Sequence, residues 1–455
     1  MESGSYPMIG RSLRTGLTLL VATLAALLLP MPAAAQDATV VEAGTLFDGR
    51  AVIEDARMVI RDGRVVAVGP RDKVAIPDGA AIVDRRGRFV MPGLIAGHSR
   101  VGTVSGIEHG GRHYSRETVA RDLAQFQRYG VVAVNALGMN RPLFHQLRRD
   151  FNGPDHGGAD LYGAGPGIGV IGGAPPEARM NTMPDQVARP ANPEEARAAV
   201  RTMADAGVDV IKIWLDALGT GAPRMPPDIY AAVIAEAHAR GLPVAAHIRD
   251  LADAKAVLAA GADIIGHGVR DQPVDDAFIA LLRERGAWYM ATINIDEANY
   301  LYAEHPEWLD DPFFRQALNP ALEARLRDAA WRRETLAGAD GARKAVAMNI
   351  ANLRTLHAAG ARIGLGTDSG GTALRIPGFA EHRELELSVA TGLSPGEALT
   401  AATWGNAQML RLQDRGTLAP GAVADFLVLD ADPTRDIRAT RTLREVWRSG
   451  RKVAP

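Results

Sequence analysis

Three short apolar runs between residues 208 and 269 constrain the fold of this chain more than any other feature. VDVIKIWL (208–215), PVAAHI (243–248) and DIIGHGV (263–269) are rich in valine, isoleucine and alanine, a composition typical of strands covered on both faces. Helical patterns at 226–241 and 250–262 separate them. Because strand and helix alternate, we expect parallel strands whose carboxyl ends lie at one face. The predicted fold class is therefore α/β, with a (β/α)₈ TIM barrel.

One candidate metal ligand stands near the carboxyl end of each run: Lys212, His247 and His267. A (β/α)₈ barrel carries its active site at that end of the strands. A single histidine in such a position is more often structural than a ligand. Two histidines on successive strands, with a lysine on the strand before them, predict a metal site instead.

The barrel is expected to occupy residues 92–415. Its first strand, within FVMPGLIAGHSRVG (89–102), should end near His98 and Arg100, and its last, RIGLGTDSG (362–370), should present Asp368. Further strands are expected at VVAVNALG (131–138), GIGVIGG (167–173) and WYMATI (288–293). Helix starts are predicted by the cap residues Ser115, Asn192 and Ser394.

The connection between the last two strands is unusually long. Residues 294–361 hold several aromatic side chains, and ordinary connections in such barrels are far shorter. Long loops over a barrel mouth are often functional. We expect a partly helical cap on the site, and an insertion that only decorates the surface is the alternative.

Both ends of the chain differ from the central part in their sequence pattern. Residues 36–91 and 416–455 show short, often alternating apolar runs, and the first of these segments is broken by DG, DGR and RGR turns, which is typical of antiparallel hairpins. We expect the two ends to pair into one small composite β-sandwich domain beside the barrel.

The first 35 residues have the layout of a secretory signal peptide. Arg11 and Arg14 precede the apolar run LTLLVATLAALLLP, and Ala33-Ala34-Ala35 offers a small-residue cleavage site. The run is shorter than the roughly 20 residues that a membrane span needs. We expect cleavage after Ala35 and a periplasmic or secreted protein.

The net charge and the cysteine content limit the classes of binding partner and of metal ligand that the chain is expected to have. Residues 1–35 hold two arginines and one glutamate, so their removal changes the formal charge from −2 to −3. This balance gives no reason to expect nucleic acid or stable membrane insertion; a small-molecule substrate is expected, and a homo-oligomer stays open. The chain has no cysteine, so a transition metal must rely on N and O ligands.

Several motifs resemble the amidohydrolase superfamily. They are FVMPGLIAGHSR (89–100), IKIW (211–214), VAAHI (244–248), IIGHGV (264–269), GLGTDSG (364–370) and the tail RGTLAPGAVADFLVLDADP (415–433). The likeness is to the exported, imidazolonepropionase-like branch, which includes lysine-carboxylated dipeptidases. It implies one or two divalent metal ions, usually zinc, and hydrolysis of an amide or ester bond by metal-activated water. The predicted function is that of a metal-dependent amidohydrolase acting on a small or dipeptide-like substrate.

The resemblance also implies roles for single residues. Lys212 would be the carboxylated lysine that bridges two metals, and His247 and His267 would bind the β metal. Asp368 would bind the α metal and act as a proton shuttle. His98 would be the first histidine of the pair on the first strand.

The chain departs from the family pattern at Arg100. The pattern Asp-x-His-x-His becomes Ala96-Gly97-His98-Ser99-Arg100, and arginine cannot lose its proton to become a ligand. A guanidinium about 4 Å from a dication would be repelled by about 8 kcal/mol at an effective dielectric of 20. We therefore expect a weakened or missing α site, with Arg100 either turned away or standing in place of that metal as a catalytic residue.

Three hypotheses follow. The first is a hydrolase with one metal at Lys212, His247 and His267, and the second is a binuclear hydrolase with an altered ligand on the first strand. The third is a non-catalytic relative that binds a ligand. His109 and His113 are candidates for a substitute ligand, although a solvated pair in a loop is the preferred interpretation.

Overall fold

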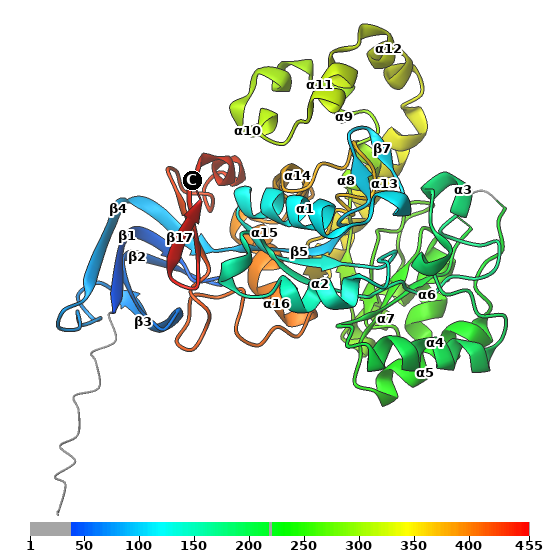
Figure 1. Ribbon diagram of the computed structural model, residues 1–455, viewed down its shortest axis with the longest axis horizontal. Helices are drawn as coiled ribbons and strands as arrows, with labels where there is room; N and C mark the ends of the chain where they lie inside the picture. Colours follow the sequence, from blue (N-terminus) through cyan, green and yellow to red (C-terminus); the bar gives the residue numbers. More distant parts are fainter. Residues whose placement is uncertain (1–37, 218–220, 455) are drawn as a thin grey trace, which may run out of the picture. The chain divides into compact units, whose positions relative to one another are not determined.

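The computed structural model describes residues 38–217 and 221–454 (Figure 1). The predicted signal peptide lies outside these residues. Within them, no helix is long and apolar enough to cross a membrane.

Eight parallel strands form the centre of the chain. Three of them pair into one sheet, called here the first ladder, and the other five pair into a second sheet, the second ladder. The first ladder contains β5 (Leu94–Ser99), β8 (Val131–Ala136) and β9 (Asp160–Gly163). The second contains β10 (Ile211–Trp214), β11 (Val244–His247), β12 (Ile264–Ile265), β13 (Trp288–Met290) and β14 (Arg362–Gly364).

Backbone hydrogen bonds join the two ladders on both sides. On one side the amide of Ile168 donates to the carbonyl of Lys212 at 2.8 Å, and the amide of Trp214 donates to Ile168 at 3.1 Å. On the other side the amide of Asp368 donates to the carbonyl of His98 at 2.9 Å. The hydrogen bonding therefore continues around the ring, and the prediction of a (β/α)₈ barrel is confirmed.

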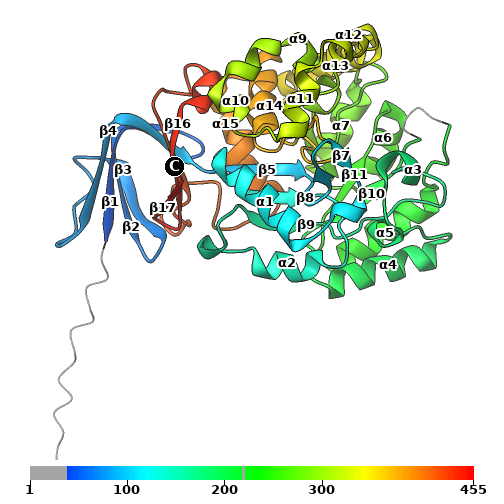
Figure 2. The same cartoon turned by 45° about the horizontal axis from the view of Figure 1, so that its top comes forward.

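Helices surround the ring of strands (Figure 2). The predicted caps are present, because the side chains of Ser115, Asn192 and Ser394 each accept a backbone N–H of the first turn. Leucine, valine and isoleucine of the helices pack against the strands in two buried clusters. The helices are α1 (Arg116–Arg128), α2 (Phe144–Asp150), α4 (Pro193–Asp205), α5 (Pro227–Ala239), α6 (Leu251–Ala259), α7 (Asp276–Arg285), α13 (Asp340–Ala358), α14 (Phe379–Ala390), α15 (Pro395–Thr400) and α16 (Asn406–Met409).

The third strand lies earlier than predicted. The strand is β9, Asp160–Gly163, and of the run 167–173 only Ile168 bridges its neighbours. Gly167 and Gly172 adopt φ values of +80° and +69°, which interrupt an extended backbone. The apolar character of this run therefore serves a loop at the barrel mouth and not a strand.

The long segment after β13 contains several short helices that lie above one end of the barrel in Figure 1. Aromatic side chains hold this cap together: the rings of Tyr302 and Phe314 stack with centroids 5.2 Å apart. The last helix of the segment, α13, packs against the barrel core through Val346, Leu353 and Leu356. The cap helices are α8 (Asn294–Glu297), α9 (Leu301–Glu304), α10 (Pro312–Arg315), α11 (Pro320–Arg327) and α12 (Ala329–Ala337).

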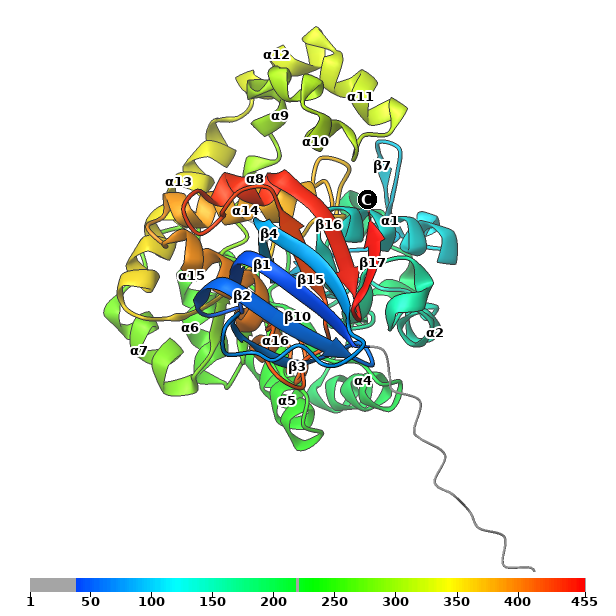
Figure 3. The ribbon, with the colours of Figure 1, turned by 90° about the vertical axis from the view of Figure 1, so that its left-hand side faces the viewer.

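The two ends of the chain form one seven-stranded sheet, as predicted for a composite domain. Its order is β17-β16-β15-β4-β1-β2-β3 (Figure 3). The amide of Val65 donates to the carbonyl of Ala422 at 2.9 Å, so the sheet curls until β3 meets the chain before β15 and encloses an apolar core. The strands are β1 (Thr39–Phe47), β2 (Val52–Arg61), β3 (Arg64–Pro70), β4 (Ala81–Pro92), β15 (Phe426–Leu429), β16 (Leu443–Arg448) and β17 (Arg451–Ala454).

Candidate metal centre and active site

The barrel brings the predicted ligands of four strands together. The ring of His267 lies between those of His98 and His247, with centroid separations of 4.5 Å on each side. Lys212 is fully buried beside them. A Cβ atom at Gly266 would lie 3.2 Å from Nζ of Lys212, so the glycine keeps the space around the amine open.

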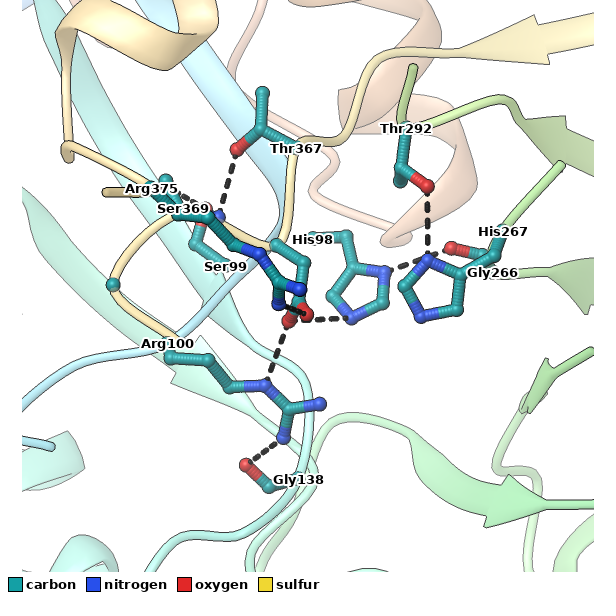
Figure 4. A network of polar contacts seen from close by, with 12 residues as sticks. His98, Ser99, Arg100, Gly138, Gly266, His267, Thr292, Thr367, Ser369 and Arg375 are labelled. Atoms are coloured by element: carbon teal, nitrogen blue, oxygen red, sulfur yellow. Dashed lines mark hydrogen bonds and ion pairs between the residues drawn. The ribbon is translucent and has the colours of Figure 1, made fainter. Parts of the chain in front are cut away.

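Two of the histidines are oriented by their Nδ1 atoms (Figure 4). Nδ1 of His98 lies 2.8 Å from the carbonyl of Gly266, to which it donates, and Nδ1 of His267 lies 2.9 Å from Oγ1 of Thr292. Metal-binding histidines are usually held by such partners on the nitrogen that does not bind the metal. Nε2 of His98 is buried and has no hydrogen-bond partner among the described residues.

The amine of Lys212 has an unusual environment. Its Nζ is buried without a hydrogen-bond partner in the described part of the chain and lies 5.6 Å from the centroid of the Trp214 ring. Burial, together with the charge of Arg100, lowers the pKa of Lys212 well below its ordinary value. The neutral amine is the form that reacts with CO₂, so this environment suits carboxylation.

Asp216 is a further acid at the centre that the sequence reasoning missed. Its Oδ1 lies 3.2 Å from Nε2 of His247, and its side chain is buried. Asp216 stands four positions after Lys212 in IKIWLD. An acid so close to the end of a strand is a possible sign of a site residue. Periodicity, however, does not predict where a side chain beyond the strand points.

The carboxylate of Asp368 is bound by two arginines, Arg100 and Arg375. Nε of Arg100 donates to its Oδ1 at 2.9 Å, and Arg375 donates to its Oδ2 at 2.7 Å. Nε2 of His98 lies 3.4 Å from Oδ1. Burial opposes ionisation of the carboxyl, but the two guanidinium groups outweigh it and lower the pKa of Asp368 below its usual value. Arg100 thus faces the centre, and Arg375 is a second residue that was not predicted.

Three residues near the centre adopt left-handed backbone conformations that side chains rarely favour. They are Met139, Thr292 and Asp368, with φ values of +56°, +46° and +54°. Such conformations cost about 1–3 kcal/mol each and gather at functional sites. Hydrogen bonds stabilise two of these strained turns, the one at Thr292 and the one at Asp368.

Two buried carboxylates of α14 make those contacts. Glu381 accepts hydrogen bonds from Oγ1 of Thr367 at 2.6 Å and from Oγ of Ser369 at 2.7 Å. Glu384 accepts from the backbone amides of Ile293 and Asn294 at 2.7 and 2.8 Å. Each carboxylate therefore fixes one turn, on either side of Asp368 and directly after Thr292. Sequence reasoning assigned neither glutamate a role.

The donors fit one divalent ion when Lys212 takes part. Among the described residues, no group of three His, Asp or Glu side chains is placed to hold an ion by itself. Carboxylation of Lys212 would add an anionic oxygen donor beside His247 and His267. Both oxygens of Asp368 are bound by arginines.

His109 and His113 do not join this centre. Nε2 of His109 lies 3.2 Å from the carbonyl of Arg179 at the rim of the barrel mouth, and Nε2 of His113 lies 3.7 Å from Glu108. His109 lines the cavity at the barrel mouth, and its described contact is with the backbone of Arg179. The interpretation as a loop pair therefore describes them better than a substitute ligand.

Comparison with known proteins places the chain in a family. The model of the amidohydrolase family matches residues 89–453. An imidazolonepropionase of Deinococcus deserti is 43% identical over 105 residues, which are 22% of this chain and 26% of that protein. The chain therefore matches only about a quarter of that relative.

Solved structures match over nearly the whole chain. The crystal structure of a putative prolidase from Bifidobacterium longum is 27% identical with a TM-score of 0.72, and covers 92% of this chain and 94% of its own. A Xaa-Pro dipeptidase with bound methionine has the same TM-score at 23% identity, over 91% of this chain and 99% of its own; this likeness shows the fold. Since the family model spans most of the chain, the protein belongs to the amidohydrolase family, and this membership supports a hydrolase that acts on carbon–nitrogen bonds.

Proposed function

We propose that this protein is a metal-dependent hydrolase that cleaves a carbon–nitrogen bond of a small or dipeptide-like substrate. One zinc ion would be held by carboxylated Lys212, His247 and His267, with His98 beside them. The observation that carries the proposal is the buried Lys212 amine, which has no hydrogen-bond partner among the described residues. An unpaired buried amine is costly, and carboxylation with metal binding removes that cost.

The chemistry divides between the ion and the side chains. A bound divalent ion lowers the pKa of water towards about 7 and polarises a carbonyl. Asp368 is ionised at neutral pH because its pKa is lowered by Arg100 and Arg375 against the opposing effect of burial, so it can accept a proton from the attacking water and return it to the leaving nitrogen. Its two arginine partners make it a weak base, so the proton resides on it only briefly.

Arg100 takes a second part in the proposal. Its Nη1 donates to the carbonyl of Gly138 at 2.5 Å while Nε holds Asp368. In this proposal its fixed positive charge takes the place that the resemblance gives to the second metal, and it would stabilise negative charge that develops on the substrate carbonyl oxygen. The proposal is therefore a mononuclear hydrolase.

One observation favours a second candidate function. The pair of arginines on Asp368 also suits a relative that binds a ligand without turning it over, because neither oxygen of the carboxylate is free of a cation. Metal content and turnover separate the two candidates.

The test uses the full mature protein expressed with zinc. We expect about one equivalent of zinc by elemental analysis, together with hydrolysis of members of a library of dipeptides, N-acyl amino acids and aromatic amides. His267→Ala should lose both. His238→Ala, at an exposed position of α5, should keep both. A wild-type protein that binds no zinc and hydrolyses no amide with any added metal would support the ligand-binding candidate.

We also propose export, on the basis of the signal-like segment 1–35. Protein recovered from the periplasmic fraction should begin at or near Gln36. An intact first residue on cytoplasmic protein would refute this.

A further inference from the structure

The barrel mouth contains a cavity of about 280 Å³ with an uneven charge. Trp214, His247 and Asp368 lie among its lining residues, so it opens onto the candidate centre. Five arginines line it against two aspartates, Asp296 and Asp368. The arginines are Arg100, Arg179, Arg249, Arg270 and Arg375.

Three of the arginines lie deep in the cavity. The side chains of Arg100, Arg270 and Arg375 are 4%, 6% and 17% exposed. Arg100 and Arg375 share Asp368, while Nη1 of Arg270 bonds Asp296 at 3.0 Å. Among the residues that line the cavity, the inner part therefore has one more cation than it has carboxylates. Nε of Arg270 is buried without a hydrogen-bond partner among the described residues.

The two outer arginines add to this excess. Arg179 forms no ion pair with any residue that the structure describes. Arg249 donates to Asp250 at 3.4 Å, but Asp250 also accepts from Arg224 at 2.7 Å. The rim therefore contributes positive charge that the protein itself only partly balances.

Cations confined in a partly buried cavity repel one another, and a bound anion offsets this repulsion. A guanidinium presents parallel N–H groups that bind a carboxylate in a bidentate way. The arginines come from separate loops after β5, β11, β12 and β14 and from α3 (Glu177–Met180), so they surround the space from several sides. This arrangement suits a ligand with negative charge at both its inner and outer ends.

We propose that this cavity selects amides that carry two carboxylates. Arg270 and Arg375 would hold the carboxylate next to the bond that is cleaved, and Arg179 and Arg249 would hold the second one at the rim. The proposal rests on the hydrolase function proposed above and names its substrate class.

The test compares three probes of nearly equal size: N-acetyl-L-asparaginamide, N-acetyl-L-asparagine and N-acetyl-L-aspartate, which carry no, one and two negative charges. Calorimetric titration of the zinc-loaded protein measures binding without requiring turnover. We expect each carboxylate to tighten binding about tenfold, since hydrogen bonds to charged groups are stronger than those between neutral groups. The gain should shrink at high salt. Equal affinity for the aspartate and asparagine probes would overturn the proposal.

Matched variants locate the effect. Arg179→Gln and Arg249→Gln should each reduce the preference for N-acetyl-L-aspartate over N-acetyl-L-asparagine by at least threefold. Arg240→Gln, which removes an arginine from the outer end of α5 beside Asp205 and Glu236, should leave the preference unchanged. An equal loss in all three variants would refute a local subsite.

Binding and turnover also separate this proposal from the one on which it rests. Charge-dependent binding with no hydrolysis of any amide would support the subsite and refute the hydrolase. Hydrolysis that proceeds equally well with uncharged amides would support the hydrolase and refute the subsite.

Discussion

Nε of Arg100 donates a hydrogen bond of 2.9 Å to Oδ1 of Asp368, the residue that the family resemblance assigns to the α metal. Both residues are buried. Arg100 therefore occupies Oδ1 of Asp368, the carboxylate oxygen that a second metal would otherwise bind. A single substitution on the first strand would then control how many ions the site holds.

Arg100→His tests this relationship. It restores a histidine two positions after His98 and frees Oδ1 of Asp368. Zinc content of the purified protein, measured by mass spectrometry, should rise from about one to about two equivalents. The rate should change by more than tenfold, or about 1.4 kcal/mol of barrier.

The matched control for this variant is Arg112→His, because Arg112 is exposed and pairs with Glu108. It should leave zinc content and rate unchanged. Arg100→His with unchanged zinc content would mean that the guanidinium does not decide the metal stoichiometry.

Lys212→Ala tests the carboxylated lysine. The variant should lose its zinc and its hydrolytic activity, while its near-ultraviolet circular dichroism stays native. Short carboxylic acids such as acetate or propionate should restore part of both, because they supply the lost oxygen donor. Lys344→Ala, on the exposed side of α13, is the control. Full zinc content in Lys212→Ala would remove the lysine from the site.

The alternation of strands and helices and the starts of several helices could be predicted because they depend on local patterns. Ser115, Asn192 and Ser394 cap helices as their side-chain chemistry requires. The third strand was misplaced, because the apolar run at 167–173 satisfies the same pattern as a strand while its glycines allow a loop. Composition alone does not separate the two.

The candidate site was predictable where its residues lie in a barrel strand or shortly after one. His98, Lys212 and His247 lie within strands and His267 follows β12, and the barrel brings them together. Arg375 and Glu384 act from a loop and a helix whose positions depend on tertiary packing, so no local pattern indicates that they reach Asp368 or the turn at 293. Arg270 likewise lies beyond its strand, where the direction of a side chain is set by the cap.

Glu384 should make stability depend on pH. Burial raises the pKa of this carboxyl from 4.5 to about 8. Between these two values the folded protein keeps the proton that the unfolded chain releases, so the free energy of unfolding falls as pH rises from about 5 to 8. Each unit of the shift corresponds to about 1.4 kcal/mol at most.

Glu384→Gln removes this titration while keeping one oxygen as an acceptor for the amides of Ile293 and Asn294. The variant should be less stable than the wild type, and this difference in the free energy of unfolding should be larger near pH 5 than near pH 8. Urea unfolding at several pH values measures the difference. Glu284→Gln, at an exposed position of α7, should show no such trend. A constant difference between variant and wild type would place the ionisation of Glu384 outside this pH range.

A buried ion network joins the terminal sheet to the barrel, and its loss should cost more stability than any surface pair. Arg448 of β16 donates to Asp160 of β9 at 2.7 Å, and its side chain is 1% exposed. Arg448→Ala would leave the Asp160 carboxylate buried with one cation fewer, which typically costs about 3–5 kcal/mol. Arg451→Ala, whose partner Asp155 is exposed, should cost less than about 1 kcal/mol. Chemical denaturation measures both, and equal losses would show that Arg448 contributes no more than a surface pair.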